Sequence, residues 1–110
     1  MELVIGQTQT FIEDWKALGF GDDELRSLEA VLLARPEAGP TIANAGGVRK
    51  VRFASEGRGK SGAARVVYIY FAAPRHVYLL LAFGKNEQAN LSADDKEYCR
   101  QIVAKIKANL

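Results

Sequence analysis

The chain has 110 residues, of which 48% are apolar and 25% charged, with a formal net charge of +2; this composition predicts one globular domain over residues 1–110 and excludes a disordered chain or a two-domain nucleotide enzyme. Its single cysteine, Cys99, excludes an internal disulfide and a cysteine-built metal cage. No apolar run approaches the roughly 18 residues of a membrane helix and no signal-peptide pattern is present, so we expect a soluble, cytoplasmic protein without a membrane partner.

The first predicted elements are a short strand and a helix. Glu2–Ile5 can pair as an edge strand of a sheet. Three apolar residues then recur at helical spacing, namely Phe11, Trp15 and Leu18. Gly19 can end this helix of about ten residues because glycine readily adopts the left-handed conformation.

A second helix is predicted over residues 21–35. The acidic residues 22–24 lie in its first turn, where carboxylates interact favourably with the helix dipole. Its apolar face consists of Leu25, Leu28, Val31 and Leu32. The helix ends at Arg35-Pro36 because a residue before proline disfavours the α conformation. Residues 36–47 show no regular period and predict a connector rather than a domain boundary.

The remainder of the chain predicts three strands and a final helix. Strands are expected over residues 48–54, 65–72 and 76–84, joined as an antiparallel meander. The second and third are continuously apolar, which is typical of central strands covered on at least one face. Ser92 and Asp95 have the spacing of a capping box before an amphipathic stripe. The predicted class is α+β: a small, mostly antiparallel sheet with two N-terminal helices and one C-terminal helix.

Positive charge is concentrated between Gly46 and Lys85. This segment holds eight cations against the single acid Glu56, whereas residues 1–45 hold three cations against eight acids. The eight cations are Arg49, Lys50, Arg52, Arg58, Lys60, Arg65, Arg75 and Lys85. Such a surface attracts polyanions at long range, and phosphate backbones are the commonest polyanions in a cell. Nucleic acid is therefore the first partner to consider.

The loop after the first basic strand contains GRGKSG at residues 57–62. This string resembles both a dinucleotide fingerprint and the end of a phosphate-binding loop. A fingerprint must open a helix, however, and a strand is predicted here; the glycine required five residues before Gly59 is Ala54. Nucleotide binding is therefore disfavoured. The segment is either a plain hairpin loop or one whose Arg58 and Lys60 contact phosphate.

Alternation along the first basic strand places Lys50 and Arg52 on one face and Arg49 on the other. The charges could simply keep an exposed sheet face soluble. Arg65 begins the next strand, however, and Lys85 follows the third, so a meander would bring four cations to one patch. Like charges on neighbouring strands repel one another. A phosphate bound between them would relieve this repulsion.

The residue types in the basic segment limit which reactions the chain could catalyse. The basic segment has no carboxylate cluster for a metal, and no Ser–His–acid arrangement is apparent. If RNA is cut, the natural route is attack of the ribose 2′-hydroxyl on its own phosphate, with a lysine as base and cations stabilising the developing charge. His76 is expected to be a solvated turn residue. Among the strand tyrosines, most of which we expect in the core, Tyr70 is the best candidate to stack on a base.

Four blocks of sequence resemble the RelE superfamily, specifically its HigB-type toxins. The blocks are ARPEAGP at 34–40, GGVRKVRFA at 46–54, GRGKSGAARVVYIY at 57–70 and YLLLAFGKNEQANLS at 78–92. The resemblance implies a RelE-like fold and the toxin of a type II toxin–antitoxin module, which enters the ribosomal A site and cleaves messenger RNA (an mRNA interferase) without a cofactor. It also implies a small helix-turn-helix antitoxin, through which alone the toxin would reach operator DNA.

The resemblance and the charge pattern together give a predicted site. The predicted catalytic residues are Lys50, Arg52, Arg65 and Lys85. The predicted RNA-binding residues are Arg49, Arg58, Lys60, Tyr70 and Asn86, and no metal ligand is predicted. The chain departs from the family pattern at Phe83-Gly84, where tyrosine-alanine is common, and this removes a polar aromatic that could touch RNA.

Two other functions remain open at this point. Some relatives of the ParE type poison DNA gyrase without cutting nucleic acid, so the chain could be an inhibitor rather than an enzyme. Alternatively, its cations could contact phosphate only, as in a passive nucleic-acid-binding module. The sequence does not distinguish these alternatives from a ribosome-dependent nuclease.

Overall fold

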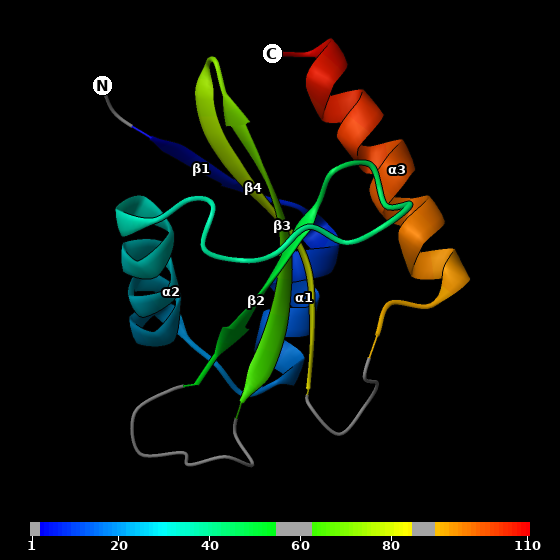
Figure 1. Ribbon diagram of the computed structural model, residues 1–110. Helices are drawn as coiled ribbons and strands as arrows, with labels where there is room; N and C mark the ends of the chain where they lie inside the picture. The colour runs from blue at the N-terminus through cyan, green and yellow to red at the C-terminus, as the bar shows by residue number, and fades with distance from the viewer. Residues whose placement is uncertain (1–2, 55–62, 85–89) are drawn as a thin grey trace.

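The computed structural model describes residues 3–54, 63–84 and 90–110 and contains three helices and four strands (Figure 1). In chain order they are β1 (Val4–Gln7), α1 (Gln9–Ala17), α2 (Asp22–Ala34), β2 (Arg49–Phe53), β3 (Ala64–Ala72), β4 (Arg75–Gly84) and α3 (Ala93–Ala108). This arrangement confirms the predicted α+β class with two N-terminal helices and one C-terminal helix. Among the described residues, no helix has the length and apolar character needed to cross a bilayer.

The four strands form one mixed sheet in the order β1-β4-β3-β2. The pairs β2/β3 and β3/β4 are antiparallel, as the predicted meander requires. Strand β1 lies parallel to β4, with Val4 opposite His76 and Gln7 opposite Leu79. The β3/β4 register shifts where Val67 pairs with Leu81 but Tyr68 pairs with Leu79, which leaves one extra residue in β4. This irregularity is a β-bulge, a feature that bends and twists a strand locally.

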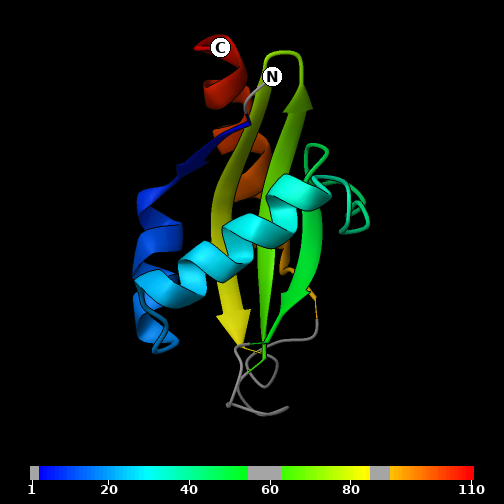
Figure 2. The same cartoon turned by 90° about the vertical axis from the view of Figure 1, so that its left-hand side faces the viewer.

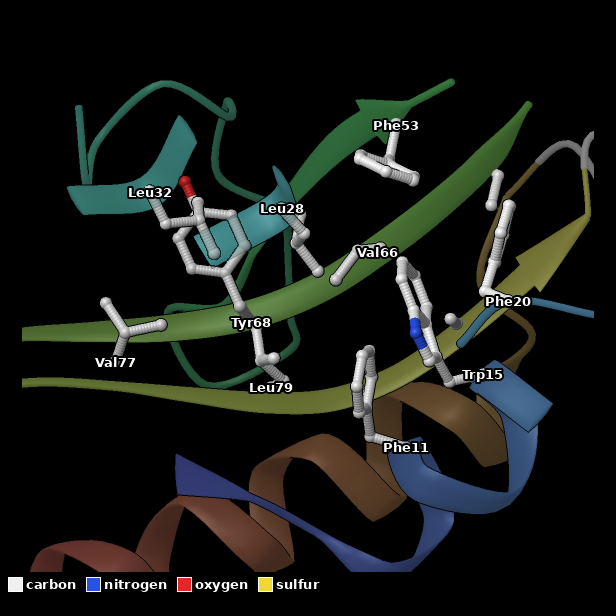
Figure 3. Packing of buried hydrophobic residues seen from close by; sticks show 12 residues of the cluster. Phe11, Trp15, Phe20, Leu28, Leu32, Phe53, Val66, Tyr68, Val77 and Leu79 are labelled. Atoms are coloured by element: carbon white, nitrogen blue, oxygen red, sulfur yellow. The ribbon is translucent and has the colours of Figure 1, made fainter. Parts of the chain in front are cut away.

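Helix α2 covers one face of the sheet and α3 the other, while α1 lies beside β4 (Figure 2). Phe11 and Trp15 of α1 join the cluster on the α2 face. The first cluster contains Phe11, Trp15, Phe20, Leu28, Leu32, Phe53, Val66, Tyr68, Val77 and Leu79, shown in Figure 3. The second joins α3 to the opposite face through Val67, Ile69, Leu80, Leu81, Phe83, Cys99 and Val103. Burial on both faces explains why β3 and β4 are continuously apolar, since neither face needs polar side chains.

The predicted cap of α3 is formed, and the structure adds a cap at the start of α1 that was not predicted. Ser92 Oγ accepts a hydrogen bond from Asp95 N (3.0 Å), and Asp95 Oδ2 accepts one from Ser92 N (3.3 Å), which is the predicted capping box of α3. At the start of α1, Thr8 Oγ1 accepts a hydrogen bond from Phe11 N (3.0 Å) and donates one to Leu80 O (2.7 Å). These bonds satisfy backbone donors that the first turn of a helix leaves without partners.

Helix α1 takes the place of a neighbouring strand along the outer edge of β4. The pairing with β1 stops at Leu79, whose carbonyl also accepts a hydrogen bond from Thr8 N (3.0 Å). Beyond the bulge, Ala82 N donates to Asp14 Oδ2 (3.0 Å). An unpaired strand edge exposes backbone donors and acceptors. The hydrogen bonds from Thr8 and to Asp14 satisfy some of these groups and hold the end of β4 in place.

The connector between α2 and β2 is fixed against the sheet by a buried tyrosine. The Tyr68 hydroxyl accepts a hydrogen bond from Gly39 N (3.0 Å) and donates one to Pro36 O (2.8 Å). Burial raises the pKa of Tyr68 above its ordinary value of 10.0, so the hydroxyl stays protonated and able to donate. A side chain at Gly39 would place a Cβ only 2.5 Å from Lys50 O, so only glycine fits where the connector crosses β2.

Two local predictions were inaccurate. The N-terminal strand was predicted at Glu2–Ile5 but runs from Val4 to Gln7, because its pairing with β4 extends toward the start of α1. His76 is not in a turn: it lies on β4, and its ring stacks on Tyr78 with ring centroids 6.1 Å apart.

The packing of α2 leads to a stability prediction. Leu28 is 1% exposed in the first cluster, whereas Leu33 on the same helix is 50% exposed. We expect Leu28→Ala to lower the free energy of unfolding by about 2–5 kcal/mol, because it removes buried methyl groups and leaves a cavity. The control Leu33→Ala should change it by about 0.5 kcal/mol or less. Urea unfolding measures both; equal losses in the two variants would contradict the orientation of α2.

Candidate functional site

The register of β2 and β3 places two arginines directly opposite each other, because Arg52 pairs with Arg65. Both side chains lie on the face of the sheet that α3 covers. Val51 and Phe53 pack against the first cluster, so Arg52 between them points to the other face. Arg65 likewise alternates with buried residues of the first cluster. Since opposing residues of an antiparallel pair have Cβ atoms about 4.5–5.5 Å apart, two positive charges are held side by side.

The Arg65 side chain has a buried nitrogen that the described residues leave without a hydrogen bond. Its Nη1 is buried and has no hydrogen-bond partner in the part of the chain that the structure describes. Leaving a buried charged donor without a partner is costly, because the group has lost its water and gained nothing in exchange. Beside a second arginine, the group that best satisfies this nitrogen is an anion such as phosphate.

Lys50 joins the two arginines to form what we call the cationic trio: Lys50, Arg52 and Arg65. Lys50 lies two residues before Arg52 on the same face of β2 and pairs with Val67. Within residues 3–54, 63–84 and 90–110, no ion pair connects a member of the trio to an acid; the ion pairs there involve Arg26, Arg49 and Arg100. The trio therefore places three cations near one another without an ion pair to an acid among the described residues, and their charges repel one another.

The structure does not bring Arg49 and Tyr70 to the trio. Arg49 lies on the opposite face of β2, where its Nη1 donates hydrogen bonds to Gly39 O (2.8 Å) and Glu37 O (3.3 Å). Its Nη2 lies 3.7 Å from the Glu37 carboxylate. These contacts hold the connector between α2 and β2 against Arg49. Tyr70 packs against the first cluster, also on the opposite face and five residues along β3 from Arg65.

The remaining predicted site residues, Arg58, Lys60, Lys85 and Asn86, lie outside the described residues. The elements that flank them do converge. Phe53 at the end of β2 pairs with Ala64 at the start of β3, and Ala64 pairs with Gly84 at the end of β4. Figure 1 shows these three ends together at one end of the sheet. The Arg52–Arg65 pair is adjacent to the Phe53–Ala64 pair in the register.

Two further side chains of the described residues, His76 and Cys99, are candidates for chemistry of their own. His76 pairs with Phe71 near the opposite end of the β3/β4 hairpin. Cys99 is buried under α3, and burial raises the pKa of its thiol to about 11, so it carries almost no thiolate at neutral pH. The described residues contain no group of three or more His, Cys, Asp or Glu side chains that could hold a metal ion.

One feature beside the trio was not anticipated from the sequence. A cavity of about 250 Å³ lies along the outer edge of β4, and we refer to it as the edge cavity. It is lined by Thr10, Asp14, Leu81, Ala82, Phe83, Asp95 and Tyr98. The sequence held one signal for it: Asp14 lies three residues after Phe11 and next to Trp15, so a carboxylate occupies the buried side of α1.

Comparison with known proteins identifies the family. A family model described as the RelE toxin of the RelE/RelB toxin–antitoxin system matches residues 7–110. The chain therefore belongs to the RelE toxin family, as its sequence blocks predicted; the HigB subtype stays a prediction. The solved structure of a free E. coli RelE toxin, a mutant with two arginines replaced by alanine, superposes with a TM-score of 0.58 at 16% identity. The match covers 94% of this chain and 99% of that one and shows a shared fold.

The trio predicts a measurable response to phosphate. Inorganic phosphate at about ten times its Kd should raise the free energy of unfolding by about 1.4 kcal/mol, compared with sodium chloride at equal ionic strength. Arg65→Gln should remove most of this increase, because it removes the charged donor for which residues 3–54, 63–84 and 90–110 supply no partner. Arg100→Gln is the control, since Arg100 already donates to Asn44 O and to Glu97. Thermal unfolding measures the response; equal stabilisation of wild type and Arg65→Gln would contradict the assignment.

Proposed function

We propose that this RelE-family toxin is a ribosome-dependent messenger RNA endonuclease that acts without a metal ion. The observation that carries the proposal is the register of Arg52 and Arg65, together with a buried Arg65 nitrogen that no described residue contacts by a hydrogen bond. Two guanidinium groups side by side can each donate to the oxygens of one phosphodiester. The charge that builds up on those oxygens during cleavage is then stabilised by donors already in position.

In the proposed reaction the ribose 2′-oxygen attacks the adjacent phosphorus and the bond to the 5′-oxygen breaks. The products are a 2′,3′-cyclic phosphate and a 5′-hydroxyl. A lysine of the site acts as the base that accepts the proton of the 2′-hydroxyl, and the leaving oxygen takes up a proton from water. Lys50 and Arg52 orient the phosphate and the 2′-hydroxyl, and Arg65 stabilises the transition-state charge. Lys85 completes the proposed catalytic set, and Arg58, Lys60 and Asn86 bind the RNA backbone.

The cellular setting of the proposal follows the family. The chain acts in the cytoplasm, where it meets messenger RNA on the ribosome. Its partner is a small helix-turn-helix antitoxin of the same module, and it reaches operator DNA only through that antitoxin. The RelE/RelB name of the matching family model supports pairing with an antitoxin.

Induction in bacteria tests the proposal. Wild type and the control Arg100→Gln should arrest growth and leave mapped cuts in messages, whereas Arg65→Gln should not. In vitro, Arg65→Gln should lower the cleavage rate about 10²–10³-fold, the usual effect of removing one donor to a developing oxyanion. Wild-type cleavage should disappear when ribosomes are omitted.

Two outcomes of this experiment would replace the proposal. Growth arrest with intact messages and trapped gyrase–DNA complexes would identify a gyrase inhibitor of the ParE type. RNA binding without growth arrest or cleavage would identify a passive nucleic-acid-binding module.

A further inference from the structure

One lysine of α3 differs from the other two in its surroundings. Lys96 is half-buried, whereas Lys105 and Lys107 are exposed. A lysine normally keeps its ammonium group in water or pairs it with a carboxylate. Within the part of the chain that the structure describes, no ion pair involves Lys96. An acid of those residues therefore does not explain its partial burial.

The helix itself offers Lys96 no acidic partner on the same face. Residues three and four positions apart share a face of a helix. For Lys96 these positions hold Ser92, Ala93, Cys99 and Arg100. None of them is a carboxylate, and like charges four residues apart, such as Lys96 and Arg100, oppose helix formation slightly. A stabilising ion pair along α3 therefore does not account for Lys96.

Lys96 lies on the side of α3 that faces β2. Arg100, about one turn further along, donates from Nη1 to Asn44 O in the connector that leads into β2. Cys99 is buried against the sheet. With 3.6 residues per turn, the direction of Lys96 falls between those of Cys99 and Arg100. Tyr98, which lines the edge cavity at β4, lies on the other side of Cys99.

The trio lies at the same level of the sheet as the start of α3. The edge cavity brings Tyr98 of α3 together with Phe83 of β4. Phe83 pairs with Arg65 on β3, and Arg65 pairs with Arg52 on β2. Because neighbouring strands lie about 4.8 Å apart, Arg52 lies about 10 Å across the sheet from Phe83, toward the side that Lys96 faces. In Figure 2 the orange start of α3 lies behind β2 and β3. Lys96 and the trio therefore border the same space, from the helix and from the sheet.

From these observations we propose that Lys96 is a fourth cation of the RNA site and binds the phosphate next to the one held by the trio. The inference rests on the proposed function, because it requires RNA at the trio. The trio already offers one phosphate two guanidinium groups and an ammonium group. Lys96 approaches from a separate element, and phosphates recur at short intervals along a strand, so it meets the neighbouring one. The RNA backbone then runs between α3 and β2.

This arrangement makes the site favour a polynucleotide over a single phosphate. Inorganic phosphate reaches the trio alone, whereas a strand engages the trio and Lys96 together. A contact to phosphate carries no sequence information, so Lys96 adds affinity for RNA of any sequence. Each further phosphate contact also releases counterions, which makes binding more sensitive to salt.

The salt dependence of RNA binding tests the assignment independently of cleavage. The probe is 2′-O-methyl hexauridylate, whose methyl groups block attack by the 2′-oxygen, and fluorescence anisotropy gives its Kd between about 50 and 200 mM sodium chloride. In Lys96→Gln the slope of log affinity against log salt should be less steep by about 0.7, the value for one lost contact to a single strand. Where the two lines meet near 1 M salt, this equals about fivefold weaker binding at 0.1 M. Lys96→Arg should keep the wild-type slope.

Lys105→Gln is the matched control, because it makes the same charge change on the same helix. Lys105 is exposed and lies nine residues after Lys96. Nine residues are two and a half turns, which places Lys105 on the opposite side of α3. This variant should keep the wild-type slope. Lysine and glutamine have similar helix propensities, so neither substitution should disturb the fold.

Stabilisation by inorganic phosphate separates Lys96 from the trio. Phosphate should raise the thermal stability of Lys96→Gln as much as that of wild type, because the trio is intact in this variant. Arg65→Gln should lose most of that increase. Lys96→Gln is therefore expected to weaken the binding of RNA without weakening the binding of phosphate alone.

Three results would overturn the inference. They are an unchanged slope in Lys96→Gln, an equal change of slope in Lys105→Gln, and loss of phosphate stabilisation in Lys96→Gln, which would place Lys96 at the phosphate of the trio. Failure of the proposed function is separate, because it would leave RNA uncleaved while Lys96→Gln still lowered the slope. Conversely, cleavage by wild type with an unchanged slope in Lys96→Gln would reject only the role of Lys96.

Discussion

The pairing of β2 with β3 imposes the constraint on which the rest of the structure depends, because it holds Arg52 and Arg65 opposite each other. Chains normally avoid like charges in opposing positions, since each such pair opposes folding. Here the unfavourable contact is accompanied by a buried guanidinium nitrogen that has no hydrogen-bond partner among the described residues. A phosphate between the two side chains would make both features favourable, and for this reason we propose the pair as the site. Unfavourable groups retained in a folded protein are typically found where a ligand binds.

The scaffold is built to maintain that register against the repulsion. Apolar clusters on both faces of β3 and β4 fix which side chains point to which face, because a slip of one residue would expose every buried one. The free edges are also secured. Asp14 and Thr8 hold the outer edge of β4, while Tyr68 and Arg49 hold the connector that crosses β2. The trio therefore sits on a framework that cannot easily separate its members.

Local patterns in the sequence were sufficient for the elements and for the faces of Arg49, Lys50 and Arg52, but not for contacts between distant segments. Helical spacing located all three helices, and alternation correctly separated Lys50 and Arg52 from Arg49. The parallel pairing of β1 and the bulge in β4 were not predictable, because a four-residue strand and a run of leucines carry no register information. Arg49 was grouped with the RNA-binding residues for its position in the chain, although its acceptors belong to the connector. The edge cavity combines α1, β4 and α3, and no single segment encodes it.

A double-mutant cycle in the free energy of unfolding tests the central claim that Arg52 and Arg65 repel each other in the free protein. The variants are Arg52→Gln, Arg65→Gln and the double mutant, unfolded by urea at low ionic strength without RNA or phosphate. Each single substitution already removes the repulsion, so the two single changes should sum to about 0.2–1 kcal/mol more stabilisation than the double mutant shows. The difference should shrink at 1 M salt. If the two single-variant changes in the free energy of unfolding sum to the change in the double mutant, the account is contradicted. The same holds if the double mutant is stabilised by more than that sum.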